Sequence, residues 1–205
     1  MRTRYALNTL GLFAFTTLVV VSVVLGPMGA APEIGGAVLP VILWLILLFA
    51  VTAGLPRLFV AEEETHTATA LRLSATPSAL FVGKLLYGLA VVFALEAVVA
   101  PLFFGMVQLS VASPGLLAVA LAGGGYGLSV GSTLVAAMVA QARGKSALFA
   151  VLLLPLMVPG LLFAVQLTRA AVAGQPPGPE LSLLLLYDAS LSVAGLMLFP
   201  AVWVP

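Results

Sequence analysis

The sequence predicts an all-α integral membrane protein, with six transmembrane helices and a short cytoplasmic helix between the second and the third. The chain has 205 residues, of which 62% are hydrophobic and only 7% charged, so it lacks the polar surface that a soluble domain needs. It contains six apolar runs, each long enough to cross the roughly 30 Å hydrocarbon core of a bilayer. The alternation of polar and apolar residues that a transmembrane barrel requires is missing.

The six predicted spans form a single transmembrane domain over residues 1–205. They cover residues 7–25, 37–55, 85–109, 116–140, 147–167 and 183–204. The first run also has features of a signal peptide, because Arg2 and Arg4 precede it and small residues follow it. We interpret it as a span, since it is longer than a signal core, Pro32 is unfavourable beside a cleavage point, and more spans follow at once.

The positions of the basic residues predict the orientation in the membrane. Seven of the eight Lys and Arg residues fall on one side of the predicted spans, and Arg169 alone falls on the other side with Glu33 and Glu180. Basic residues favour the cytoplasmic side. The sequence therefore predicts that both termini, the 58–84 segment and the loop around Arg143 and Lys145 are cytoplasmic. The net charge of +1 indicates no affinity for nucleic acid, and the absence of cysteine excludes disulfides and thiol chemistry.

The segment from about 60 to 77 is the main cytoplasmic feature. It begins with three consecutive glutamates, and Pro77 ends the helix that its residues predict. One interpretation is a solvated boundary of the second span. The other is a short interfacial helix that docks a soluble partner, because this is the only inward loop long enough for one. The docking candidates are Glu62, Glu63, Glu64, Thr65, His66, Thr67 and Arg72.

No catalytic constellation or metal cluster is predicted. The chain has no cysteine, one histidine and few carboxylates. The glycine-rich stretch in the fourth span lacks the Gly-Lys-Ser/Thr ending of a phosphate-binding loop. Three glycines of this stretch recur every four residues and therefore fall on one face of the predicted helix: Gly123, Gly127 and Gly131. They are predicted to let a neighbouring helix approach closely.

Polar and helix-breaking residues inside the spans are candidates for function. Glu96 lies near the middle of the third span, where an ionised carboxylate is costly, so it is either a group on a translocation path or a buried structural hydrogen-bonding group. Asp188 is a second candidate, although Asp188, Tyr187 and Trp203 also fit positions at the membrane interface. Pro155, Pro159 and Gly160 interrupt the fifth span and predict a kink or hinge, which serves either alternating access or curvature alone.

Several stretches resemble the CcmB family, the permease of the cytochrome c maturation ABC transporter, over nearly the whole chain. They are "RTRYALN", "FVAEEETHTATALRLSATP" followed by "VGKLLYG", and "ARGKSALFAVLLLPLMVPGLLFAV". Permeases of the wider ABC-2 exporter group share the plan of six spans and an acidic intracellular helix. Family members usually have a longer amphipathic start and a charged tail, whereas this sequence starts at "MRTRYALN" and stops at "AVWVP".

The resemblance implies a bacterial inner-membrane permease in which the 60–77 segment is the coupling helix that docks on the ATPase CcmA. ATP hydrolysis would then take place on CcmA, with CcmC, CcmD and a second CcmB copy as further partners. Heme would be a substrate of the complex, exported or released with its chaperone, and not a cofactor of this chain. His66 is interpreted as a polar contact and not as a heme ligand. Two alternatives remain: an ABC-2 permease for another lipid or hydrophobic substrate, and a membrane scaffold that transports nothing.

Overall fold

The computed structural model describes residues 2–25, 32–55, 76–139 and 145–203, and these residues form α-helices joined by short connections. The all-α prediction is therefore confirmed for the part of the chain that is described. The helices are α1 (Arg2–Leu25), α2 (Pro32–Gly54), α5 (Pro77–Met106), α6 (Pro114–Val139), α7 (Lys145–Ala173) and α8 (Pro179–Trp203).

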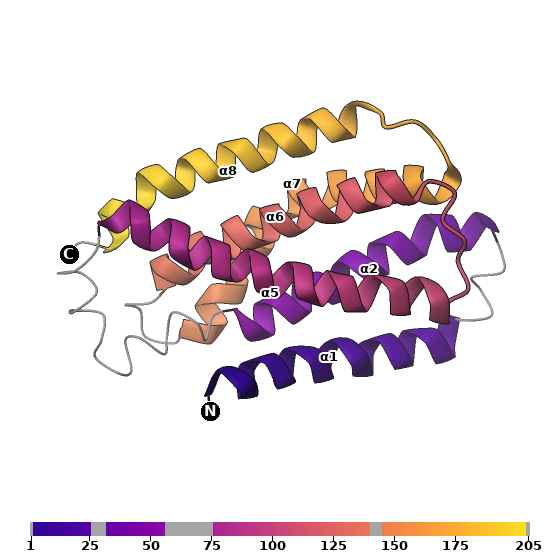
Figure 1. Ribbon diagram of the computed structural model, residues 1–205, viewed down its shortest axis with the longest axis horizontal. Helices are drawn as coiled ribbons and strands as arrows, with labels where there is room; N and C mark the ends of the chain where they lie inside the picture. The colour runs from indigo at the N-terminus through magenta and orange to yellow at the C-terminus, as the bar shows by residue number, and fades with distance from the viewer. Residues whose placement is uncertain (1, 26–31, 56–75, 140–144, 204–205) are drawn as a thin grey trace.

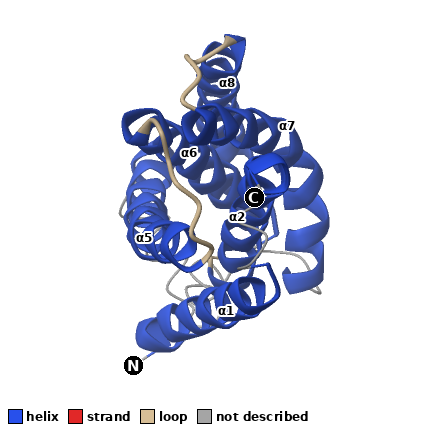
Figure 2. Ribbon diagram, turned by 90° about the vertical axis from the view of Figure 1, so that its right-hand side faces the viewer, coloured by secondary structure: helices blue, strands red, loops and turns tan. Residues whose placement is uncertain are grey.

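The helices run back and forth along the long axis of the molecule (Figure 1). At one end of this bundle α1 begins and α8 ends, and at the other end α5 connects to α6 and α7 connects to α8. A view along the bundle places α6 and α2 inside, with α1 at the periphery (Figure 2). In agreement with that view, α6 packs against α2, α5, α7 and α8. Any site built on α6 is therefore shared by most of the bundle.

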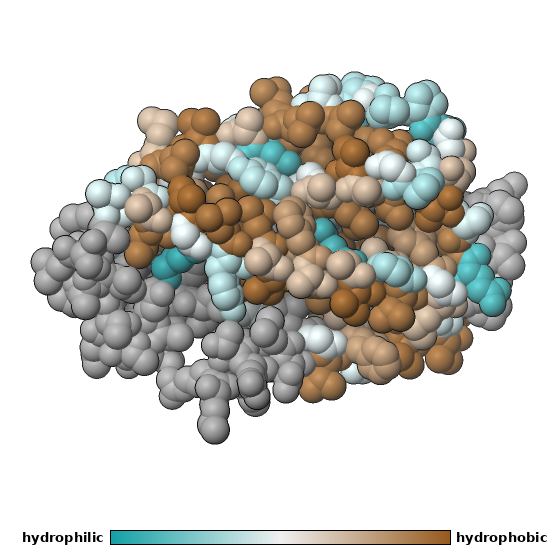
Figure 3. Space-filling model, viewed as in Figure 1, coloured by the Kyte–Doolittle hydropathy of each residue, from teal (hydrophilic) through white to brown (hydrophobic). Residues whose placement is uncertain are grey.

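Five helices have the length and composition of membrane spans. Within the described residues these are Gly35–Gly54, Pro77–Met106, Pro114–Val139, Leu148–Ala173 and Pro179–Ala201. The segment Gly11–Val24 of α1 is apolar but shorter. Most of the face seen in Figure 3 is hydrophobic, as expected of a surface that meets lipid.

The helices are longer than the apolar runs that predicted them, and α5 and α7 show this most clearly. The start of α5 is at Pro77 instead of residue 85, so Lys84 lies within the helix, and the predicted 60–77 segment overlaps that start. Proline suits the first position of a helix, because a backbone N–H at that position has no acceptor within the helix and its absence costs nothing. At its end, α7 continues to Ala173, so Arg169 lies in its last turns and not in a loop. Apolar runs mark the hydrocarbon thickness, whereas a helix continues into the head-group layer, where long basic side chains reach water.

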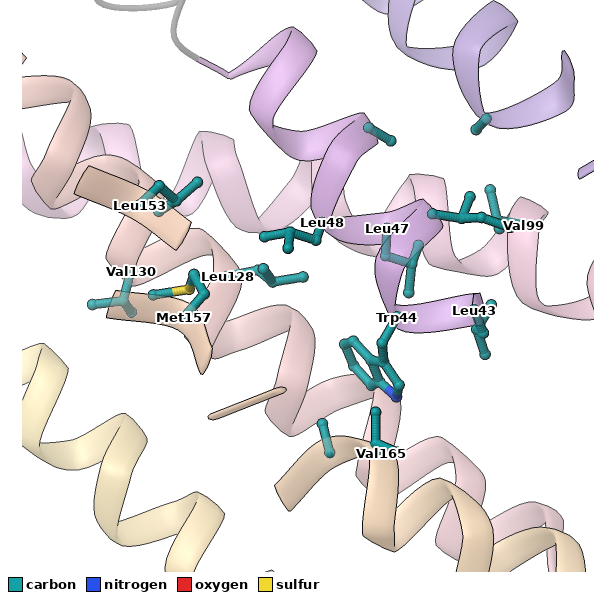
Figure 4. Packing of buried hydrophobic residues seen from close by; sticks show 14 of the residues in the cluster. Leu43, Trp44, Leu47, Leu48, Val99, Leu128, Val130, Leu153, Met157 and Val165 are labelled. Atoms are coloured by element: carbon teal, nitrogen blue, oxygen red, sulfur yellow. The ribbon is translucent and has the colours of Figure 1, made fainter. Parts of the chain in front are cut away.

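Trp44 of α2 occupies the centre of the packed interior (Figure 4). Its indole Nε1–H donates a hydrogen bond to Thr168 Oγ1 of α7 at 3.0 Å. Thr168 in turn donates to the Ala164 carbonyl at 2.8 Å. Because both side chains are buried, this bond satisfies the one polar atom of the tryptophan and joins α2 to α7.

We expect Thr168→Val to destabilise the protein by about 1–3 kcal/mol, because it leaves the buried indole N–H without an acceptor. The matched variant Thr168→Ser keeps the hydroxyl and should lose clearly less stability. The measurement is thermal unfolding in detergent, followed by tryptophan fluorescence. A Thr168→Val variant that unfolds at the same temperature as the wild type would show that this hydrogen bond does not stabilise the protein.

Candidate functional site

Consecutive glycines on α6 each receive a side chain from a different helix. The direction of a side chain turns by about 100° per residue in an α-helix, so three neighbours point in three directions. At each of these glycines, a side chain of another helix fills the space that a Cβ atom of that residue would take. Leu184 of α8 does so at Gly123, Trp44 of α2 at Gly124, and Glu96 of α5 at Gly125.

The three glycines that were predicted to contact one neighbouring helix, at positions 123, 127 and 131, contact two different helices. A Cβ added at Gly127 would lie 2.6 Å from Asp188 Oδ1 of α8, and Gly123 also faces α8. Gly131, one turn further on, receives the Met157 side chain of α7. The repeat of four therefore spans two interfaces, since 3.6 residues per turn makes such a stripe drift around the helix.

Glu96 is buried on the α5–α6 interface. Its side chain is 5% exposed, and its Oε1 atom has no hydrogen-bond partner among the described residues. A Cβ at Gly125 would lie 2.5 Å from this oxygen, so the carboxyl group occupies space that only glycine leaves open. On the same interface Ser129 Oγ donates to the Gly125 carbonyl at 2.9 Å. The α5–α6 interface is thus polar at the depth of the carboxylate.

Asp188 occupies the matching position on the α6–α8 interface. It is 5% exposed, and its Oδ1 atom has no hydrogen-bond partner within the part of the chain that the structure describes. Its backbone carbonyl accepts a hydrogen bond from Ser192 Oγ at 2.7 Å. The Ser192 hydroxyl also shares a hydrogen bond of 2.8 Å with the Tyr126 hydroxyl of α6.

The two carboxyl groups lie at nearly the same depth. Glu96 meets α6 at Gly125 and Asp188 meets it at Gly127, two residues further along the same helix. At 1.5 Å per residue, the two contacts are about 3 Å apart along α6, within the membrane-spanning length of that helix. A carboxylate at such a depth is expensive unless it is paired or hydrated, and it therefore marks a functional site by default. Glu96, Asp188 and the α6 glycines between them form the candidate functional site.

The prolines of α7 lie within one continuous helix. Pro155 and Pro159 are inside α7, and a Cβ at Gly160 would lie 2.7 Å from Tyr187 Cε1. The Tyr187 hydroxyl donates to the Leu156 carbonyl. Tyr187 therefore belongs to the α7–α8 contact and not to the membrane interface, because eight residues of α8 precede it. The hinge at Pro155, Pro159 and Gly160 stays a prediction.

The predicted docking residues lie outside the described part of the chain. Glu62, Glu63, Glu64, Thr65, His66, Thr67 and Arg72 all fall within residues 56–75. No group of three or more His, Cys, Asp or Glu side chains that could hold a metal ion occurs among the described residues.

Two features of the structure were missed by the sequence analysis. The first is that Gly124 and Gly125 admit Trp44 and Glu96, which the run of three glycines could have suggested. The second is a cavity around Arg169, for which the signal was a lone basic residue at the otherwise acidic end of the predicted spans.

The fold and the site define a class. Three observations make this a multi-pass α-helical membrane protein: helices long enough to span a bilayer, close helix packing on glycine, and buried carboxyl oxygens that have no hydrogen-bond partner among the described residues.

The family described as "CcmB protein" matches residues 1–202. Heme exporter protein B of Bradyrhizobium diazoefficiens is 30% identical over 168 residues, which cover 80% of this chain and 74% of that protein. No solved structure matches. The chain belongs to the CcmB family. It is thus a permease subunit of the cytochrome c maturation ABC transporter and works with an ABC ATPase, without being the catalytic subunit itself.

Proposed function

We propose that this permease couples ATP hydrolysis on CcmA to heme export, or to the release of heme-loaded chaperone, for the maturation of c-type cytochromes. The observation that carries the proposal is the family match over residues 1–202. The relative named as a heme exporter, aligned over 80% of the chain, supports heme as the substrate.

In this proposal the chain spans the inner membrane six times, with α1 as the additional span and both termini in the cytoplasm. Two observations support the arrangement. The start of α1 and the end of α8 lie at the same end of the bundle (Figure 1). Seven of the eight basic residues of the sequence belong to that side of the predicted topology. CcmC, CcmD and a second copy of this chain complete the proposed complex.

The proposed transport step involves the three-helix region around α6. Glu96 and Asp188 provide polar groups at one depth on the two sides of α6, next to glycines that let α5 and α8 approach closely. A buried polar atom without a partner lowers stability, so packing alone does not account for either carboxyl group. Relative movement of α5, α6 and α8 would expose these groups to substrate or water, with α7 bending at its prolines.

The 60–77 segment is the proposed coupling helix, and the three glutamates are its contacts to basic residues on CcmA. We expect the change of Glu62, Glu63 and Glu64 together to Ala to weaken association with CcmA by about tenfold, since exposed ion pairs contribute up to about 1 kcal/mol each. The measurement is co-purification of CcmA with the permease from detergent extracts, at equal permease levels in the membrane.

The control for this experiment is Glu180→Ala, which removes a carboxylate at the opposite end of the bundle and should leave CcmA binding unchanged. If the triple variant binds CcmA as well as the wild type does, the glutamates are only a solvated helix boundary. The docking role of the segment is then wrong.

A further inference from the structure

A cavity of about 450 Å³ lies at the end of the bundle where α7 leads into α8. Its walls come from the first turns of α2, the last turns of α7 and the α7–α8 connection, and its polar lining consists of Gln166, Arg169, Gln175 and Glu180. The remaining lining residues are small or cyclic, so the polar groups are not covered by large side chains. Polar residues also gather over the α7–α8 connection in Figure 3, at the upper right.

Arg169 is held in place with most of its hydrogen-bonding capacity unused. Its Nε and Nη2 atoms donate to the Ala37 carbonyl of α2 at 3.1 and 2.6 Å. A guanidinium has five N–H donors, so three remain without an acceptor among the described residues. Because the two bonds to α2 fix the plane of the group, the free donors form a pre-oriented fork for an oxyanion.

Glu180 lines the same cavity but makes no ion pair with Arg169 among the residues described. Its Cδ atom lies 3.3 Å from the place that a Cβ of Gly178 would take, so this glycine makes room for the carboxylate. One cavity thus presents a cation and an anion that are not paired with each other. A ligand with one negative and one positive group can pair with both side chains, whereas a simple anion would be repelled by the Glu180 carboxylate.

We propose that this cavity binds the phosphoethanolamine head group of a membrane lipid, with the phosphate on Arg169 and the ammonium group on Glu180. The location supports a lipid as the source, because the cavity lies at the ends of membrane-spanning helices, where head groups reside. The volume falls within the range of about 300–1,000 Å³ that is usual for small-ligand sites. The site is separate from the proposed heme function and does not depend on it.

The test is native mass spectrometry of the full-length permease in complex with its ATPase, after removal of lipid by detergent exchange. Four ligands are added in turn: dioleoyl phosphatidylethanolamine, phosphatidylglycerol and phosphatidylcholine with the same chains, and free phosphoethanolamine. We expect phosphatidylethanolamine to bind about tenfold more tightly than the other lipids, because phosphatidylglycerol lacks the ammonium group and the choline group has no N–H donor. Free phosphoethanolamine should bind measurably but more weakly than the lipid.

Variants separate the two charges. We expect Arg169→Gln and Glu180→Gln each to lower the affinity for phosphatidylethanolamine about tenfold, and Glu180→Gln to raise the affinity for phosphatidylglycerol. The control is Ser110→Ala, an exposed position in the α5–α6 connection at the same end of the bundle, which should change nothing. Since Glu180 makes no hydrogen bond to another helix in the described structure, Glu180→Gln tests the proposal even if Arg169→Gln disturbs the fold.

Three results would overturn the proposal. Equal affinities for the three lipids would show an adventitious contact, and tight binding of phosphatidylglycerol that Glu180→Gln leaves unchanged would indicate a plain anion site. Free phosphoethanolamine binding as tightly as the lipid would make the source a soluble metabolite.

Discussion

Replacement of Gly124 with valine is expected to destabilise the bundle by about 3 kcal/mol or more, at the upper end of overpacking effects. The indole ring of Trp44 occupies the space where the Cβ atom of residue 124 would lie. This ring cannot move aside easily, because it is buried and its Nε1–H is bonded to Thr168. The measurement is the yield of monodisperse protein and its midpoint of thermal unfolding in detergent.

The matched control for this variant is Gly115→Val, also on α6. A Cβ at Gly115 meets nothing within 4 Å, and valine is no less favourable than glycine in a helix, so little change in stability is expected. A double variant, Gly124→Val with Trp44→Ala, should recover part of the loss by vacating the ring's space. If Gly124→Val and Gly115→Val unfold at the same temperature, close packing of α2 on α6 does not limit the stability.

Glu96→Gln is expected to abolish cytochrome c maturation while the protein keeps its fold. Glutamine has nearly the same shape, and a neutral amide costs less to bury than a carboxylate, so thermal stability should be equal or higher. Maturation is measured as covalent heme attachment to a reporter cytochrome in cells that lack the wild-type gene, with association of CcmA checked in the same cells. Loss of maturation in an assembled complex would contradict a purely scaffolding role.

A second variant moves the carboxylate without removing it. The Cβ atom of Gly125→Ala would lie 2.5 Å from Glu96 Oε1, so the carboxyl group of Glu96 has to move away from α6. We expect a partial loss of maturation, smaller than that of Glu96→Gln. Gly105→Ala on α5, where a Cβ meets nothing within 4 Å, serves as the control. Normal maturation with reduced stability in Glu96→Gln would instead assign Glu96 a structural hydrogen bond.

Pattern reasoning worked best where a single physical term dominates. The length of an apolar run decides whether a segment can cross the lipid, and all six predicted runs correspond to helices in the structure. The ends were less accurate because head-group positions tolerate polar residues, as Lys84 and Arg169 show inside α5 and α7. Glu96 was recognised as unusual from its charge alone, since a carboxylate in the middle of a span is costly in any fold.

The sequence by itself determined the medium, the helical class and the family resemblance, because these depend on composition and on local runs of residues. Only the tertiary structure decided which side chains share a place. Glu96 and Asp188 lie on opposite sides of α6 at nearly the same depth, and Arg169 and Glu180 line one cavity without forming an ion pair with each other. These relations join residues up to 92 positions apart, from Glu96 to Asp188, and they depend on helix rotation and packing, which one helix's sequence does not encode.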